Sequence, residues 1–144
     1  MIFEVEESVD APADAVWQCM TDTARMPRWM SGIEHMRTAD GKAIGEGSTL
    51  LFVARGAERT TRVSEFEPSR RMTLISTQGP VTATYRYALT PGKNGQPPTR
   101  IVLNAACVAS GWMAIFMPLL GPLIRKTDGT QLKLLKELVQ DEPG

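Results

Sequence analysis

The chain has 144 residues, a length typical of one domain that buries roughly two-thirds of its unfolded surface without disulfides or metals. Sixteen basic and sixteen acidic side chains give zero formal charge, so no overall field attracts nucleic acid or an anionic membrane. We therefore expect residues 1–144 to form a single domain whose partner is neutral and is not a nucleic acid.

The chain begins with a pattern typical of a strand followed by a helix. Ile2 to Val9 mixes apolar and acidic residues in a strand-like way. The segment DAPADAVW then predicts a helix with Pro12 in its first turn. Its apolar side is formed by Val16, Trp17 and Met20.

A second short helix is predicted directly after the first. Pro27 lies in its first turn, Trp29 and Met30 form its apolar face, and Gly32 ends it. Two short helices therefore separate the first strand from the rest of the chain.

The pattern from Ile33 to Ser110 predicts six antiparallel strands, separated by ADGKAIGEG, ARGAE, EPSRR, QGP and TPGKNGQPPT. Strict alternation assigns two inward faces, which consist of Ala83, Tyr85, Tyr87 and Leu89, and of Ile101, Leu103, Ala105, Cys107 and Ala109. Several of these side chains are small, which leaves room for a ligand on a concave face. The alternative is that Trp17, Trp29, Phe52 and the methionines fill this space.

The C-terminal part predicts a long amphipathic helix. Its apolar stripe is Leu120, Ile124, Thr127, Gln131, Leu134 and Leu138. Pro122 either starts or kinks this helix, and Gly129 lowers its helix propensity. The uncharged segment from Gly111 to Ile124 is shorter than the roughly 20 residues that span a bilayer, so we expect no transmembrane segment.

This order of elements, β-α-α-β6-α, predicts an α+β fold in which a curved seven-stranded antiparallel sheet wraps around the long C-terminal helix. Together with VDAPADAVWQCMTDTARMPRWMSGI, IGEGSTL, VSEFEPSRRMTL and TRIVLNAACVASG, it resembles the START-like helix-grip superfamily, also called SRPBCC. The likeness runs from Ile2 to Val139 and is greatest to the polyketide cyclase/dehydrase-like and coenzyme Q-binding-like branch of small bacterial proteins. Its most specific features are Asp22 after the first helix and Trp29 followed by a glycine.

The resemblance implies a START-like ligand-binding domain with a cavity between sheet and helix that holds a lipid, quinone or polyketide-like molecule. The residues expected to line this cavity are Trp29, Met30, Phe52, Tyr85, Tyr87, Leu103, Cys107, Met113, Phe116, Leu120 and Ile124. Ordinary core packing is the alternative reading for each of them.

Few residues suggest catalysis, and we name no catalytic residue. His35 is the single histidine, which argues against an imidazole metal centre, and we expect neither a metal nor a cofactor. Cys19 and Cys107 are interpreted as inert core thiols. Glu58, Glu65 and Glu67 cannot be assigned to a face, and we expect two of them to pair with arginines at positions 59, 62 or 70.

Three functions fit these observations. The first is a carrier or sensor for a hydrophobic small molecule, and the second is a polyketide cyclase or aromatase that uses Tyr85 or Tyr87 to relay protons. The third is an interaction module, or a homodimer, that uses the apolar segment from Trp112 to Leu120. The absence of a signal-peptide pattern and the absence of a CxxC motif favour a cytoplasmic protein.

Overall fold

The computed structural model describes residues 2–30, 32–111 and 130–141. Its strands are β1 (Ile2–Val9), β2 (Ile33–Thr38), β3 (Thr49–Ala54), β4 (Ala57–Glu67), β5 (Arg71–Gln78), β6 (Val81–Thr90) and β7 (Thr99–Ala109). Its helices are α1 (Ala13–Thr21), α2 (Met26–Trp29), a single 3-10 turn (Lys93–Gly95) and α4 (Gln131–Asp141). The expected order of strands and helices is thereby confirmed.

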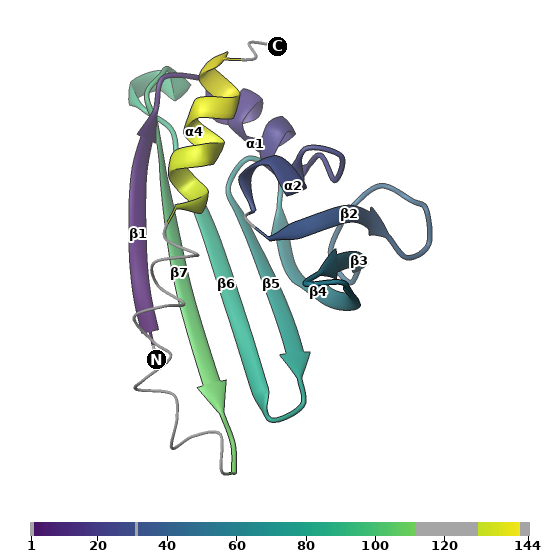
Figure 1. The fold of residues 1–144 in the computed structure, drawn as a ribbon. Helices are drawn as coiled ribbons and strands as arrows, with labels where there is room; N and C mark the ends of the chain where they lie inside the picture. The colour runs from purple at the N-terminus through teal and green to yellow at the C-terminus, as the bar shows by residue number, and fades with distance from the viewer. Residues whose placement is uncertain (1, 31, 112–129, 142–144) are drawn as a thin grey trace.

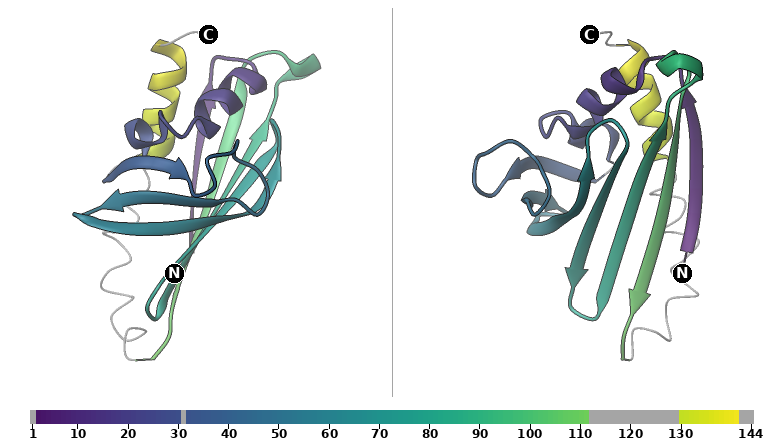
Figure 2. Two further views of the ribbon diagram at one scale, coloured as in Figure 1. Left: turned by 90° about the vertical axis from the view of Figure 1, so that its right-hand side faces the viewer. Right: turned by 180° about the vertical axis from the view of Figure 1, so that it is seen from behind.

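All seven strands form one antiparallel sheet in the order β1-β7-β6-β5-β4-β3-β2. Figure 1 shows that β1, β7, β6 and β5 run side by side, whereas β2, β3 and β4 turn away from them. The left view in Figure 2 shows these three strands crossing in front of the others, so the sheet is strongly curved. A curved sheet of this kind has one concave face that helices can cover.

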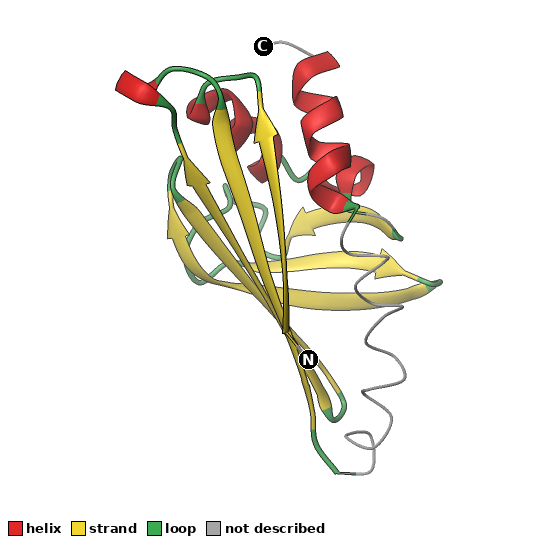
Figure 3. Cartoon of the chain, turned by 90° about the vertical axis from the view of Figure 1, so that its left-hand side faces the viewer, coloured by secondary structure: helices red, strands yellow, loops and turns green. Residues whose placement is uncertain are grey.

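Helices α1, α2 and α4 lie at one end of the sheet, on its concave side (Figures 1 and 3). Helix α4 packs against β1, α1 and α2. Two polar contacts add to this packing: Lys136 Nζ lies 3.2 Å from Glu7 Oε1, and the backbone N–H of Asp10 donates to Gln140 Oε1 at 3.0 Å. The sheet and the C-terminal helix therefore have the predicted helix-grip arrangement.

The inward faces predicted for β6 and β7 are confirmed. The residues on them that the structure buries are Tyr87, Leu89, Ile101, Leu103, Ala105 and Cys107. Their neighbours on the other side of the strands, such as Arg86 and Arg100, are exposed. The predicted apolar faces of the first two helices are buried as well, with Trp29 fully inaccessible to solvent.

The predicted stripe of the C-terminal helix is partly wrong. Leu134 is half-buried, and the buried residues of α4 are Gln131, Leu132, Leu135, Leu138 and Val139. Because α4 contacts two helices and a strand together, its buried face is broader than a single row of residues. Leu120, Ile124 and Thr127 of that stripe, and Pro122 and Gly129, lie outside the described residues. No described helix is both long enough and apolar enough to cross a bilayer.

Candidate functional site

A cavity of about 310 Å³ lies on the concave face of the sheet, beside the first residue of α4. Its apolar lining is Met30, Gly32, Ile33, Met36, Phe52, Ala54, Leu74 and Ala83. Its polar lining is Arg55, Arg59, Thr61, Ser76, Gln78 and Gln131, together with Tyr85 and Tyr87. Small-molecule pockets usually span about 300–1,000 Å³, so this cavity suits a compact ligand.

The cavity contains some of the residues predicted to bind a ligand. Met30, Phe52, Tyr85 and Tyr87 line it. The remaining described residues, Trp29, Leu103 and Cys107, are buried in the core without lining it. Met113, Phe116, Leu120 and Ile124 lie outside the described residues.

One wall of the cavity joins the sheet to the C-terminal helix through a hydrogen bond. The phenol of Tyr87 donates to Gln131 Oε1 at 2.7 Å. Within the described residues the Nε2 group of Gln131 has no acceptor, so two N–H donors remain at the cavity wall. Trp29 packs edge-on against the Tyr87 ring, with 5.7 Å between ring centroids.

The indole N–H of Trp29 is buried and lacks a hydrogen-bond acceptor among the described residues. Burying an unpaired donor of this kind costs about 1–3 kcal/mol. Among the described residues, the indole of Trp29 is therefore held by apolar packing and by the Tyr87 ring, without a hydrogen bond.

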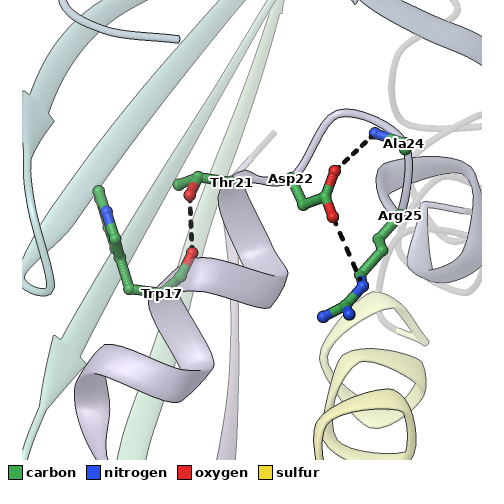
Figure 4. Close-up of polar contacts among 5 residues, drawn as sticks. All are labelled: Trp17, Thr21, Asp22, Ala24 and Arg25. Atoms are coloured by element: carbon green, nitrogen blue, oxygen red, sulfur yellow. Dashed lines mark hydrogen bonds and ion pairs between the residues drawn. The ribbon is translucent and has the colours of Figure 1, made fainter. Parts of the chain in front are cut away.

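The link between α1 and α2 leads into the helix that carries Trp29, and Figure 4 shows the polar contacts of this link. Asp22 Oδ1 accepts the backbone N–H of Ala24 at 3.0 Å, and Asp22 Oδ2 lies 3.5 Å from Arg25 Nε. The hydroxyl of Thr21 donates back to the Trp17 carbonyl at 2.8 Å. An acidic residue at position 22 thus stabilises the turn that leads into α2.

The middle of the cavity floor contains two hydroxyl groups that bind each other. Ser76 Oγ donates to Thr61 Oγ1 at 2.7 Å, and Thr61 Oγ1 donates to the Ile75 carbonyl at 3.1 Å. Both hydroxyl protons are therefore used within the protein. This pair offers a ligand lone pairs but no donor.

Two arginines line the cavity from the β3–β4 hairpin. Arg59 lies on β4 opposite Phe52, and Arg55 occupies the two-residue turn between Ala54 and Ala57. Arg55 has φ 52° and Gly56 has φ 75°, as a type I′ turn requires. A left-handed conformation costs a residue other than glycine about 1 kcal/mol. Asparagine is preferred to arginine at this position of the turn.

The other residues weighed for chemistry lie away from this cavity. His35 is exposed at an irregular position of β2. Cys19 and Cys107 are buried and are not joined by a disulfide. Within the described residues, no group of three or more His, Cys, Asp or Glu side chains is placed to hold a metal.

The three glutamates are placed by the strand pairing of β4 and β5. Glu58 is exposed, and Glu65 accepts a hydrogen bond from Thr73 at 3.1 Å. Glu67 pairs with Arg71 at 3.3 Å, so the predicted arginines at positions 59, 62 and 70 are wrong for this residue. The reason is the tight turn after β4, which places Arg71 directly opposite Glu67.

Several lining residues were missed by sequence reasoning, above all Arg55, Arg59 and Gln131. For Arg59, the sequence did contain a signal that could have placed it in the lining. The two-residue turn ARGA fixes the register of β3 and β4, and this register places position 59 opposite Phe52. Gln131 was placed on the buried stripe of the helix, but nothing in the sequence pairs it with Tyr87.

Comparisons with known proteins agree with this geometry. The family described as polyketide cyclase/dehydrase and lipid transport matches residues 2–140. No protein with curated annotation matches the chain in sequence. A protein from Thermus thermophilus has a similar structure at 19% identity, with a TM-score of 0.73 and 100% of both chains covered.

Two enzymes of known structure also resemble the chain. Norcoclaurine synthase from Thalictrum flavum, in complex with dopamine and hydroxybenzaldehyde, is 15% identical, with a TM-score of 0.72 over 100% of this chain and 88% of that chain. The di-domain ARO/CYC BexL from the BE-7585A biosynthetic pathway is 20% identical, with a TM-score of 0.77 over 97% of this chain and 46% of that chain. At these identities the likeness establishes the fold.

Proposed function

Because the chain belongs to the polyketide cyclase/dehydrase and lipid transport family, we propose that it binds a hydrophobic small molecule on the concave face of its sheet, as a carrier or sensor. The cavity of about 310 Å³ is the observation that carries this proposal. Its lining combines apolar walls with a few polar groups, which is the usual composition of a small-molecule site.

The chemistry of the lining favours binding over turnover. None of the described residues that line the cavity is His, Asp, Glu, Lys or Cys. These side chains supply most general acids, general bases and nucleophiles near neutral pH. The proton of the Tyr87 phenol is already donated to Gln131, which leaves this phenol less suited to proton transfer.

A cavity-filling substitution tests the binding site directly. Ala83 lines the cavity from β6, whereas Ala88 lies exposed on the same strand, on the other face of the sheet. The neutral fluorescent probe N-phenyl-1-naphthylamine should bind the wild-type protein and the Ala88→Phe variant. The Ala83→Phe variant should bind it at least about tenfold more weakly, because the added ring occupies the ligand volume.

Thermal unfolding of both variants controls for overpacking, which costs about 1–3 kcal/mol when a core site has no spare volume. The proposal is overturned if the wild-type protein binds neither this probe nor any member of a panel of neutral lipids and quinones. Equal binding by the two folded variants would move the site away from this cavity.

A cyclase or aromatase activity is the second candidate, and the presence of Tyr85 and Tyr87 in the lining favours it. Replacement of each tyrosine by phenylalanine should abolish turnover of a reactive polyketide chain while probe binding persists. Unchanged turnover in both variants would remove this candidate.

We also propose a cytoplasmic location, which is supported by two cysteines not joined by a disulfide. The interaction or homodimer alternative rests on residues 112–120, which lie outside the described residues.

A further inference from the structure

The charge of the cavity lining differs from the charge of the whole chain. The chain as a whole is neutral, with 16 basic and 16 acidic side chains. The described lining residues include Arg55 and Arg59 and contain no Asp or Glu. The cavity is therefore locally positive although the chain is balanced.

Strand alternation explains how the acidic neighbours are kept away from the cavity. Glu58 directly precedes Arg59 on β4, and Glu34 directly follows Ile33 on β2. Successive side chains of a strand point to opposite faces, so these two carboxylates lie on the face opposite to the cavity. Both glutamates are exposed.

The two arginines of the cavity also lack ion-pair partners within the described part of the chain, since the ion pairs found there involve other residues. Arg71, by contrast, pairs with Glu67. Guanidinium groups without a partner beside a cavity are suited to bind an oxyanion, because their N–H groups form paired hydrogen bonds with carboxylate or phosphate oxygens.

The arginines at the positive end of the cavity lie far from the Tyr87–Gln131 pair at its opposite end. Met72 pairs with Tyr87, Leu74 with Tyr85 and Ser76 with Ala83. Ser76 follows Met72 by four residues, so the level of Tyr87 lies about 13 Å from the level of Ser76. Arg59 lies on β4 beyond Ser76, and Leu74 and Tyr85 line the cavity between the two levels.

We propose that the ligand is an amphiphile with an oxyanionic head group, a carboxylate or a phosphate, held by Arg55 and Arg59. Its apolar body lies against Leu74, Phe52 and Ala83, and an acceptor at its far end receives the Nε2 hydrogens of Gln131. This proposal rests on the proposed binding function and specifies the class of ligand.

The turn at Arg55 supports this assignment independently. Arginine at φ 52° is a poor choice for the first position of a type I′ turn, where asparagine is preferred. The backbone of the turn therefore does not account for an arginine at this position, whereas the cavity beside its side chain does. The Arg55→Asn variant should therefore unfold at a temperature no lower than the wild-type protein while losing part of its ligand selectivity.

Three naphthalene compounds of nearly equal shape test the head group. Displacement of N-phenyl-1-naphthylamine should show that 2-naphthoate, 2-naphthyl phosphate or both bind at least about tenfold more tightly than neutral 2-naphthamide. The preferred anion identifies the source of the oxyanion as a carboxylate or a phosphate. Added salt should reduce the preference, because partly exposed charges are screened.

Matched variants assign the preference to the two arginines. Arg59→Gln and Arg55→Asn should each lower the anion-to-amide ratio several-fold. Arg62→Gln removes the same charge from an exposed position of β4 on the opposite face of the sheet, and it should keep the wild-type ratio.

Two results overturn this inference. One is an anion-to-amide ratio near one in a wild-type protein that binds the neutral probe and 2-naphthamide, which leaves the proposed binding function intact. The other is an equal loss of the ratio in Arg62→Gln and Arg59→Gln, which would assign the effect to overall charge. Failure of the neutral probe and 2-naphthamide to bind the wild-type protein would instead count against the proposed function itself.

Discussion

The phenol of Tyr87 donates a 2.7 Å hydrogen bond to Gln131 Oε1, and both side chains are at least nine-tenths buried, with 1% and 7% exposure. The bond connects the middle of β6 to the first residue of α4 and forms part of the cavity wall. A buried polar pair of this kind stabilises a protein modestly, but the loss of one partner leaves the other unsatisfied.

The Tyr87→Phe substitution should lower the free energy of unfolding by about 1–3 kcal/mol, because the Gln131 oxygen loses its donor while the ring remains. Gln131→Met should also destabilise the protein. The double variant should be more stable than the sum of the two losses predicts, since neither buried polar group then remains alone. Urea unfolding of the four proteins measures this coupling, and strictly additive losses would contradict it.

Trp29→Phe should lower the free energy of unfolding by less than an ordinary large-to-small core substitution does. The smaller ring loses apolar burial, but it also removes an indole N–H that is buried without an acceptor among the described residues. The two effects oppose each other, so we expect a net loss below about 2 kcal/mol, compared with about 3–5 kcal/mol for Trp29→Ala. A loss above about 3 kcal/mol for Trp29→Phe in urea unfolding would indicate that the N–H has an acceptor in solution.

Asp22 should stabilise the α1–α2 link mainly through its hydrogen bond to the Ala24 N–H. Asp22→Ala removes this bond and should cost about 1 kcal/mol, as the loss of a helix cap does. Asp22→Asn keeps the acceptor and removes the ion pair with Arg25, in which both side chains are about one-third exposed or more, so it should cost less. Equal losses for the two variants in thermal unfolding would assign the stabilisation to the ion pair.

Thr99 and Arg100 begin β7 and should contribute very differently to the stability of the protein. The Thr99 hydroxyl is buried and donates to the Ala11 carbonyl at 2.7 Å, so Thr99→Val should cost about 1–3 kcal/mol. Arg100 pairs with Glu6 on the surface, and this hydrogen bond and charge raise the pKa of Arg100. Arg100→Gln should change the unfolding midpoint only slightly, because both side chains of this ion pair are exposed. The change should be the same at pH 5 and pH 9, because Arg100 stays charged throughout this range. A midpoint that falls clearly in Arg100→Gln would contradict this.

The sequence allowed a correct prediction of the fold because β6 and β7 alternate strictly and because the turns between strands carry glycine or proline. Tyr87 and Leu103 fall on the buried face for this reason. The early helices were also predictable: Pro27 lies in the first turn of the second, although this helix ends at Trp29 and not at Gly32 as predicted. The local sequence pattern was sufficient to predict an element and its buried side wherever that element buries only one face.

The prediction was incomplete where a local pattern is interrupted. The pairing of β4 with β5 shifts register between Val63 and Glu65, and this irregularity disrupts the alternation that would have assigned Glu65 and Glu67 to a face. The face of α4 was misjudged at Leu134, because contacts with several elements decide it. The bond between Tyr87 and Gln131 depends on tertiary packing and has no local signature.

The pairing of β1 with β7 has a consequence for the order of folding. Ile2 pairs with Ala106 and Val9 with Thr99, so the first strand binds a partner that lies far from it in the sequence. Strands β2 to β7 pair with sequence neighbours and can form hairpin by hairpin during synthesis, whereas β1 must wait until β7 has been made. Such long-range pairing slows folding, typically into the range of milliseconds to seconds. A circular permutant that joins the two chain ends and opens the chain between β1 and α1 would place β1 after α4, closer in sequence to β7, and should fold faster.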